Sequence, residues 1–321
     1  MEILLKIKNL KVNFYTYRGI VKAVNIDNLK IYKGETLGLV GETGCGKSVT
    51  ASAMLKLIPS PGKIEEGEII FEGENLIAKK EMREIRGERI AMIFQDPMAS
   101  LNPVFTIGEQ ITRVIRTHTS MEKKEAEKRA IEMLKIVELP DPEKMLKSYP
   151  HELSGGQRQR VMIVMALSCN PSLLIADEPT TALDVTIQAQ ILRLLNNLKS
   201  RINASILLIT HNLGVVAQIC DRVAVMYAGN IVEYGDIKEV FKNPKHPYTV
   251  GLLETVPNPK KKVEMLSVIK GNVPNLIDPP SGCRFHPRCK YMRDICKKKR
   301  PKLIEIGKEH KVSCFLYNDQ K

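Results

Sequence analysis

The sequence predicts an α/β fold with a mostly parallel β-sheet, and three observations support this prediction. Apolar runs of strand length alternate with helical patterns and turns as far as about residue 255. The apolar run 36–40 is followed at once by a glycine-rich turn, residues 41–48, that fits the pattern G-x-x-x-x-G-K-[ST]. A second apolar run ends in the acidic pair Asp177 and Glu178. These features, in this order, are typical of P-loop nucleoside triphosphatases.

The glycine-rich turn is predicted to hold the phosphates of a nucleotide. Its backbone N–H groups can surround a phosphate, and the helix that follows points its positive end at the same group. Lys47 is placed to reach the β- and γ-phosphates, and the Ser48 hydroxyl is placed to ligate Mg²⁺. The predicted nucleotide-binding residues of this segment are Gly41, Glu42, Thr43, Gly44, Cys45, Gly46, Lys47, Ser48 and Val49.

The acidic pair is predicted to serve the same reaction. A strand end of this kind can present one carboxylate to Mg²⁺ and the next to an attacking water. We assign Asp177 to the metal and Glu178 to the base that orients the water. Because phosphoryl transfer depends mainly on positioning and charge neutralisation, Glu178 is the group expected to limit hydrolysis. The alternative is a solvated acidic turn, since polar residues are common where strands run into loops.

A long helical pattern runs from Gly155 to about Leu167, and Ser154 stands before it as an expected N-cap. The glycines Gly155 and Gly156 leave backbone N–H groups open at the start of the helix. Such a helix end favours an anionic ligand. The segment therefore predicts a second phosphate-contacting element.

These motifs and their order resemble those of ATP-binding-cassette (ABC) ATPases, whose signature is matched by Leu153-Ser154-Gly155-Gly156-Gln157. The resemblance implies a P-loop ABC cassette that binds ATP and Mg²⁺ as cofactors. It also implies that Ser154, Gly155, Gly156 and Gln157 act on the γ-phosphate of ATP held by a second cassette. The working unit is therefore expected to be a dimer.

Three further residues take their expected roles from the resemblance. Gln95 follows the strand-like run 90–94, where the family keeps a glutamine that touches Mg²⁺ and water and senses the membrane subunit. His211 follows the run 206–210, where the family keeps a histidine that contacts the γ-phosphate. Asp184 takes the family's position at the dimer interface. The resemblance thus implies a catalytic set of Glu178, His211 and Gln95 and a Mg²⁺ ligand set of Ser48, Gln95 and Asp177.

The family holds adenine against an aromatic residue near the end of its first strand. Here Tyr17 is favoured, because it stands just before the turn Arg18-Gly19 at roughly the family's distance from the glycine-rich turn. Tyr15 is the alternative, and a tyrosine that only packs is a further one.

The resemblance extends to the ATP-binding subunits of dipeptide and oligopeptide permeases (Dpp/Opp), over nearly the whole chain. It rests on Ser100-Leu101-Asn102-Pro103, Tyr149-Pro150-His151-Glu152, Asp184–Gln190, His246-Pro247-Tyr248-Thr249 and Gly271-Asn272-Val273-Pro274. It implies ATP-driven import of dipeptides or oligopeptides. The implied partners are a second, related ABC ATPase, two transmembrane permeases and an extracytoplasmic binding protein. Related cassettes serve nickel chelates and some sugars, so the transported molecule stays open.

The 321 residues predict two parts. The cassette is expected over 1–256, with an inserted α-helical subdomain at about 96–165 that includes the amphipathic pattern Met121–Val137. A small, irregular, cysteine-rich module is expected over 257–321, after the break Pro257-Asn258-Pro259. No apolar run approaches the roughly 18 residues of a membrane span, and the N-terminus lacks a signal-peptide pattern. We therefore expect a cytoplasmic protein, peripheral on the inner face of the cell membrane.

Four of the seven cysteines fall in the predicted module: Cys283, Cys289, Cys296 and Cys314. A cytoplasmic location argues against disulfides, and their density points to a metal. Both zinc and an iron–sulfur cluster accept four thiolates, and His286 and His310 keep zinc open. Reduced cysteines that only pack are the third alternative. The family resemblance, carried by Gly282–Cys289, implies a [4Fe-4S] cluster. We expect Arg284, Arg288 and Lys290 to attract such an anionic group.

The module is also basic. Residues 258–321 contain 16 Lys and Arg against 6 Asp and Glu, in a chain of formal net charge +13. A soluble ABC ATPase acting on nucleic acid or the ribosome is the alternative from another class. It is disfavoured because the module has few aromatics for base stacking and the chain carries a single set of cassette motifs, so no nucleic acid partner is expected.

Overall fold

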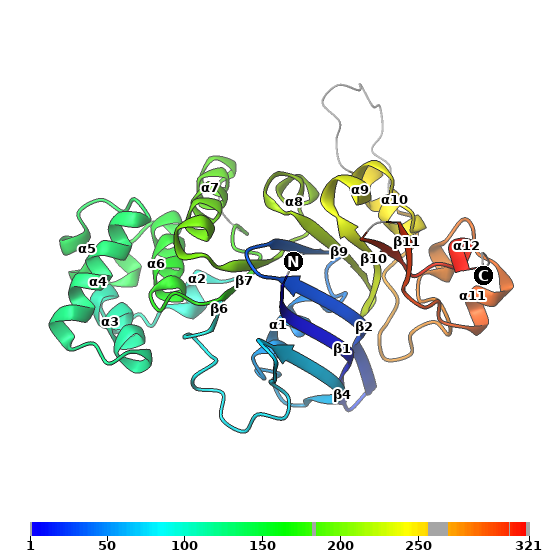
Figure 1. Ribbon diagram of the computed structural model, residues 1–321, viewed down its shortest axis with the longest axis horizontal. Coiled ribbons are helices and arrows are strands. Elements are labelled where there is room, and N and C mark those ends of the chain that lie inside the picture. The colour runs from blue at the N-terminus through cyan, green and yellow to red at the C-terminus, as the bar shows by residue number, and fades with distance from the viewer. Residues whose placement is uncertain (1, 182–183, 256–268, 308, 319–321) are drawn as a thin grey trace. The chain divides into compact units, whose positions relative to one another are not determined.

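The structure is a computed structural model that describes residues 2–181, 184–255, 269–307 and 309–318. The chain divides into two compact units, one made of Met1–Lys79 with Leu208–Lys321 and the other of Lys80–Leu207. Both units combine strands and helices (Figure 1).

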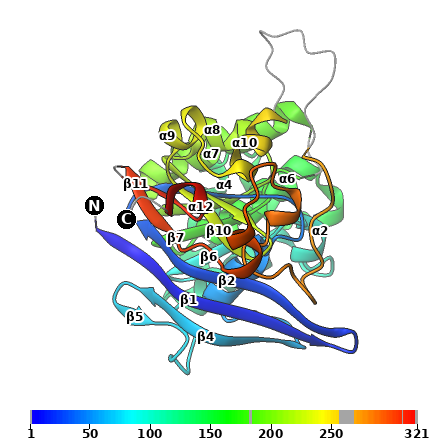
Figure 2. The same ribbon diagram turned by 90° about the vertical axis from the view of Figure 1, so that its right-hand side faces the viewer.

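An antiparallel sheet of the first unit has the strand order β2-β1-β4-β5 (Figures 1 and 2). Its strands are β1 (Ile3–Thr16), β2 (Gly19–Tyr32), β4 (Gly62–Phe71) and β5 (Glu74–Asn75). Successive side chains of a strand point to opposite faces, so the alternating apolar residues gather on one face. Leu5 lies opposite Ile31 and Ile7 opposite Leu29, all four of them fully buried. These apolar cross-strand pairs fix the register of the sheet.

The glycine-rich turn is carried by a second sheet of the first unit. The strands are β3 (Thr36–Val40), β9 (Arg222–Tyr227), β10 (Asn230–Asp236), β11 (Ile304–Gly307) and β12 (His310–Val312). Strand β3 pairs in parallel with β9, whereas β9–β10, β10–β12 and β12–β11 are antiparallel pairs. Every residue of β3 and β9 is buried, as expected for parallel strands covered on both faces.

The helices of the first unit are mostly short. They are α1 (Lys47–Met54), α8 (Leu213–Ile219), α9 (Ile237–Lys242), α10 (Pro247–Glu254), η2 (His286–Arg288), α11 (Asp294–Lys298) and α12 (Phe315–Asn318). Helix α1 starts directly at the end of the glycine-rich turn.

The second unit combines two parallel strands with most of the longer helices. Strand β6 (Ile90–Ile93) pairs in parallel with β7 (Leu173–Asp177). The helices are α2 (Pro97–Ser100), α3 (Ile107–His118), α4 (Lys123–Ile136), α5 (Pro142–Lys147), η1 (Pro150–Glu152), α6 (Gly155–Leu167) and α7 (Val185–Ile202). Helices α3, α4, α5 and α6 pack against one another around buried apolar residues such as Ile111, Met133 and Leu134.

Strand β8 (Ser205–Ile209) lies where the chain passes between the units. In the second unit, the Ser205 N–H donates to the Ser172 carbonyl before β7. In the first unit, the Thr210 N–H donates to the Leu39 carbonyl of β3 at 3.4 Å.

Several predicted elements have the expected bounds. The predicted strand 36–40 is β3, and the predicted helix from Gly155 to Leu167 is α6. The segment 256–268, with the predicted break Pro257-Asn258-Pro259 and the start of the predicted module, lies outside the described residues, as do Ala182 and Leu183. Within the described ranges, each helix is too short or too polar to cross a membrane.

Candidate nucleotide-binding site and cysteine cavity

The glycine-rich turn joins β3 to α1 in a conformation that depends on glycine. Gly41 and Gly46 have φ values of 153° and 105°, in the region that side chains disfavour. A Cβ at Gly41 would collide with the Met226 carbonyl, and one at Gly46 with the Ala23 carbonyl. The turn is further anchored because the Gly229 N–H donates to the Cys45 carbonyl at 2.8 Å. The sequence pattern G-x-x-x-x-G is therefore required by the close approach of neighbouring backbone.

Lys47 is directed along the turn. Its side chain is buried, and its Nζ donates to the carbonyls of Gly41 at 2.8 Å and Glu42 at 3.1 Å. Ser48, Thr43 and Gly44 are exposed, which leaves that part of the turn open to a ligand. The buried ammonium and the open turn suit a phosphate.

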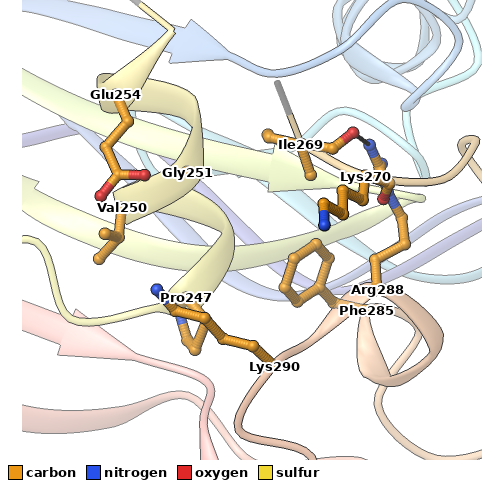
Figure 3. Close-up of a pocket in the computed structure, with 9 residues that line it drawn as sticks. All are labelled: Pro247, Val250, Gly251, Glu254, Ile269, Lys270, Phe285, Arg288 and Lys290. Carbon is orange, nitrogen blue, oxygen red and sulfur yellow. Dashed lines mark hydrogen bonds between the residues drawn. The ribbon is translucent and has the colours of Figure 1, made fainter. Parts of the chain in front are cut away.

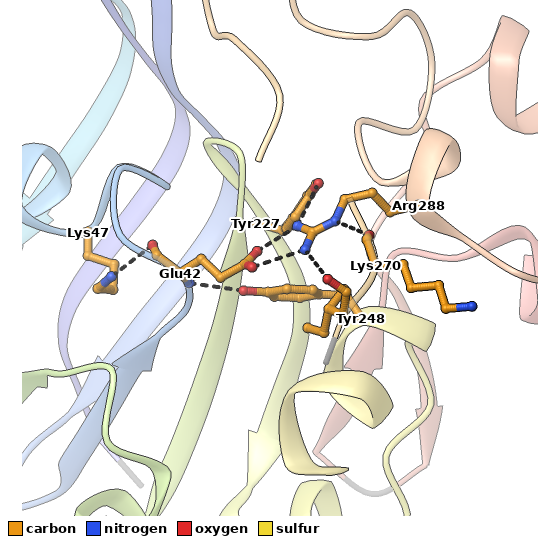
Figure 4. A network of polar contacts seen from close by, with 7 residues as sticks. Glu42, Lys47, Tyr227, Tyr248, Lys270 and Arg288 are labelled. Atoms are coloured by element: carbon orange, nitrogen blue, oxygen red, sulfur yellow. Dashed lines mark hydrogen bonds and ion pairs between the residues drawn. The ribbon is translucent and has the colours of Figure 1, made fainter. Parts of the chain in front are cut away.

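Glu42 joins the turn to two residues from distant parts of the first unit (Figure 4). Its backbone N–H donates to the hydroxyl of Tyr248 at 3.0 Å, and its carboxylate accepts two hydrogen bonds from Arg288, at 2.8 and 3.1 Å. Burial alone would lower the pKa of Arg288, but the hydrogen bonds to Glu42 and Tyr227 raise it above the ordinary value. The sequence predicted a nucleotide contact for Glu42 but not its contacts with Tyr248 and Arg288.

In the second unit, the acidic pair ends β7 as predicted. Asp177 is buried at the strand end, and Glu178 follows with φ of 47°, a left-handed conformation that is uncommon for a residue with a side chain. The Glu178 carboxylate accepts from the Thr181 hydroxyl at 2.9 Å and from the Gln95 amide at 3.4 Å. The structure thus brings together two of the three predicted catalytic residues. An unusual backbone conformation at a polar strand end is a common feature of functional sites.

The predicted signature forms the start of α6. The Ser154 hydroxyl accepts from the Gln157 N–H at 3.3 Å, and the Gln157 side chain accepts from the Ser154 N–H at 2.9 Å. This is a capping box, which confirms the predicted N-cap. Ser154 is exposed and Gly155 and Gly156 are half-buried, so the helix start faces solvent in the single chain. Asp184 is exposed and stands directly before α7, where its side chain makes no capping hydrogen bond.

The remaining predicted residues lie in the first unit. His211 is exposed directly after β8, and the next residue, Asn212, caps α8. Tyr17 lies at the hairpin turn between β1 and β2 with 91% of its surface exposed. Tyr15 is 42% exposed, and its hydroxyl donates to Glu65 at 2.9 Å. Tyr17 therefore has the more accessible ring.

The four module cysteines line one small cavity. Its other lining residues include His246, Phe285, His286 and Arg293. The Cys283 N–H donates to the Cys296 carbonyl at 2.8 Å, which ties two of the cysteine-bearing segments together. Within the described ranges, no three His, Cys, Asp or Glu side chains are arranged to hold a single metal ion. Four thiols around one cavity nevertheless fit the donor set of a larger cluster.

The thiols influence one another. Burial, together with the neighbouring Cys296, Cys314 and Cys289, raises the pKa of Cys283 to about 12. Burial, together with Cys289 and Cys296, raises the pKa of Cys314 to about 11. Without a positively charged centre these thiols stay protonated at neutral pH. A metal group would therefore have to displace their protons on binding.

The histidines and arginines near the four cysteines have partners that the sequence did not predict. His310 is buried and its Nε2 lies 2.7 Å from the Glu233 carboxylate, whereas His286 lines the cysteine cavity. The hydrogen bonds of Arg284 go to the carbonyls of Ala228 and Lys22, and Arg288 pairs with Glu42, so neither guanidinium is held by a bond to the cysteines. Arg293 is the basic residue that lines the cavity.

A separate pocket of the first unit lies beside α10 (Figure 3). Its lining residues are Pro247, Val250, Gly251, Glu254, Ile269, Lys270, Phe285, Arg288 and Lys290. Arg288 and Phe285 therefore border this pocket, and Phe285 also lines the cysteine cavity.

Comparison with known proteins gives the family. A model described as ABC transporter matches residues 24–181, and one described as the C-terminal region of oligopeptide/dipeptide transporters matches residues 232–296. The chain is 52% identical over 317 residues to the oligopeptide transport ATP-binding protein OppD of Bacillus subtilis, covering 98% of this chain and 88% of that protein. It is 49% identical over 322 residues to the probable peptide ABC transporter ATP-binding protein y4tR of Sinorhizobium fredii, covering 99% of this chain and 96% of that protein.

A solved structure agrees with the fold. The dimeric structure of MJ0796, a bacterial ABC transporter cassette, is similar with a TM-score of 0.65 and 30% identity, over 73% of this chain and 98% of that chain. The predicted α/β P-loop cassette is confirmed. From its motifs, its fold and its similarity along almost its full length, the chain belongs to the ATP-binding subunits of oligopeptide and dipeptide ABC transporters and is an ABC-type ATPase.

Proposed function

We propose that this chain hydrolyses ATP to power the uptake of dipeptides or oligopeptides through partner permeases. The observation that carries the proposal is that one chain joins an ABC cassette to the C-terminal region of peptide transporters, with about 50% identity along nearly all of its length. The described geometry supports an ATP site, because the open glycine-rich turn and the buried Lys47 suit a triphosphate.

The proposed assembly contains a second, related ABC ATPase, two transmembrane permeases and an extracytoplasmic binding protein. The chain itself would lie in the cytoplasm, at the inner face of the membrane. The exposed start of α6 supports a role for Ser154 and its glycines on ATP held by the second cassette, and Asp184 would contribute to that dimer interface.

The proposed chemistry gives each residue one task. Lys47 and the backbone N–H groups of the turn hold the phosphates, and Tyr17 stacks on adenine. Ser48, Gln95 and Asp177 bind Mg²⁺, which neutralises the charge that develops on the phosphates. Glu178 orients the attacking water, and His211 contacts the γ-phosphate. The contact between Gln95 and Glu178 supports their acting together.

The test is Glu178→Gln in the assembled transporter, reconstituted in vesicles with the binding protein and labelled peptides. We expect ATP to bind normally while ATP turnover falls at least about 100-fold, because the amide cannot take a proton from water. Peptide uptake should fall with it. Glu132→Gln is the matched control, since that carboxylate lies exposed on α4 and pairs only with Arg129 of the same helix among the ion pairs of the described residues.

The outcomes separate two claims. Near-normal ATP turnover in Glu178→Gln would contradict its assignment as the base. A wild-type transporter that hydrolyses ATP yet accumulates no dipeptide or oligopeptide would contradict the substrate assignment and favour another cargo, such as a nickel chelate.

We further propose that residues 257–321 form a module whose Cys283, Cys289, Cys296 and Cys314 bind a [4Fe-4S] cluster. The cavity that all four line supports this, as does the absence of a tight pair of C-x₂₋₄-C spacing that zinc sites favour. When bound, the cluster would fix the loops that carry the cysteines and add an electron-accepting centre.

Iron, sulfide and zinc contents, measured on protein purified without oxygen, test the cluster. We expect about four irons per chain and a brown visible absorption that Cys289→Ser loses. Cys169→Ser, at a half-buried cysteine of the second unit, should keep both. Stoichiometric zinc, or no metal, would contradict the cluster while leaving the ATPase assignment intact.

A further inference from the structure

Arg288 uses every N–H of its guanidinium. The Nη atoms donate to the two Glu42 carboxylate oxygens at 2.8 and 3.1 Å, to the Tyr227 hydroxyl at 3.4 Å and to the Ile269 carbonyl at 3.1 Å. The Nε donates to the Lys270 carbonyl at 3.0 Å. Guanidinium has five N–H donors, so this set satisfies all of them. Only 5% of the Arg288 side chain is exposed.

The pair links two distant parts of the sequence. Glu42 belongs to the glycine-rich turn, and Arg288 ends the short helix η2 between Cys283 and Cys289. Two parallel N–H···O bonds give the pair one geometry, which a single flexible contact would not do. Glu42 is itself 27% exposed, so its carboxylate lies at the edge of the turn rather than in the core.

The contacts of Glu42 continue to the phosphate-binding lysine (Figure 4). Its carbonyl accepts from Lys47 Nζ at 3.1 Å, its N–H donates to Tyr248, and its carboxylate accepts from Arg288. Three different groups of one residue are therefore held by three different partners. A displacement of the Glu42 side chain would be transmitted directly to the backbone that Lys47 contacts.

Aromatic rings pack beside Arg288. Its guanidinium lies 5.7 Å from the centre of the Tyr227 ring, and that ring packs on Tyr248 at 4.6 Å and on Phe285 at 5.1 Å. Tyr227 and Tyr248 are almost completely buried. Figure 3 shows Arg288 beside Ile269 and Lys270, at the edge of the pocket next to α10. The guanidinium is thus held in place by packing as well as by hydrogen bonds.

We propose that Arg288 is a positioning residue for ATP binding: it pairs with the Glu42 carboxylate and neutralises it, so that the glycine-rich turn can accept the triphosphate. Without Arg288, an uncompensated carboxylate at the turn would repel the phosphates. The cysteine-rich module is therefore part of the nucleotide site. This proposal rests on the proposed binding of ATP at the glycine-rich turn.

A purely structural role makes a different prediction. If Arg288 only stabilised the fold, removing the Glu42 charge would not repair its loss, because the guanidinium contacts would still be missing. If Arg288 acts by neutralising Glu42, replacing that carboxylate by a neutral amide should restore ATP binding. The double variant therefore separates the two roles.

The experiment is titration of the full-length chain with ATP in EDTA, where no Mg²⁺ supports hydrolysis, with thermal melting of each variant in parallel. Arg288→Met keeps the aliphatic stem on Tyr227 and removes the charge. We expect it to weaken ATP binding about tenfold or more, and Arg288→Met with Glu42→Gln to bind within about threefold of wild type. Lys290→Met is the matched control, since Arg288 and Lys290 flank Cys289 equally, and it should bind like wild type.

Lys47→Ala provides the reference for the site itself. If it binds ATP like wild type, the glycine-rich turn is not the ATP site, and both proposals fail. If Lys47→Ala loses ATP while Arg288→Met keeps wild-type affinity, the role of Arg288 alone is overturned. It is equally overturned if the double variant binds as weakly as Arg288→Met, or if Lys290→Met weakens binding by the same factor.

Discussion

The imidazole of His246 illustrates how one buried residue can make stability depend on pH. His246 caps α10, where its Nδ1 accepts from the backbone N–H of Tyr248 at 3.1 Å, and the backbone N–H of His246 donates to the Glu233 carboxylate at 2.8 Å. The residue is 1% exposed. Burial lowers the pKa of His246 from 6.5 to about 4, although the nearby Glu233 opposes this shift. The folded protein therefore keeps this imidazole neutral where the unfolded chain would protonate it.

The lowered pKa predicts a loss of stability in mild acid. Between pH 6.5 and about 4 the unfolded state binds a proton at His246 that the folded state does not, so the free energy of unfolding falls as the pH falls. The full effect is on the order of 3 kcal/mol. His246→Asn keeps a capping acceptor but does not titrate. Urea unfolding at pH 7.5, 6 and 5 should show a larger loss in wild type than in His246→Asn, and equal losses would contradict the prediction.

The elements near the nucleotide motifs were predictable because their signals are local. An apolar run followed by a glycine-rich turn predicted β3, and a serine before a helical pattern predicted the N-cap of α6. The strand end at Asp177 and Glu178 was predicted from the same kind of local pattern. The left-handed φ of Glu178 was not, because no sequence pattern indicates it.

The contacts of the cysteine-rich segment were not predictable, because they join residues far apart in the chain. Arg288 and Glu42 are separated by 246 positions, and nothing in the local pattern pairs them. The closeness of Arg288 to Cys289 suggested that its charge serves the cysteines, whereas its guanidinium contacts Glu42. The strand β12 is three residues long, and its pairing with β10 depends on the register of a distant strand.

In the structure, the C-terminal segment is integrated into the first unit. Strand β12 extends the sheet beside β10, and the Ser313 N–H donates to the Val232 carbonyl at 2.8 Å. Arg284 donates to the carbonyls of Ala228 and Lys22, next to the anchor of the glycine-rich turn. The contacts place the segment in the same compact unit as the first sheet.

The buried carboxylate of Glu233 joins the C-terminal segment to the rest of the first unit. It is fully buried in β10 and accepts from the N–H groups of Lys245 and His246, each at 2.8 Å. Its third partner is His310 of β12, at 2.7 Å. Removing one partner of a buried carboxylate strongly destabilises the folded state. The C-terminal segment therefore supplies a contact that the rest of the unit cannot replace.

A chain that ends after Thr255 tests the integration at the scale of the whole molecule. We expect it to be less stable than the full chain by about 5 kcal/mol or more, because Glu233 loses His310, β10 loses its neighbouring strand and the Arg284 contacts disappear. His310→Leu in the full chain removes only the first of these contacts and should fall between the two in urea unfolding. A shortened chain that unfolds at the same urea concentration as the full chain would contradict this prediction. It would show that the cassette does not need residues 257–321 for its stability.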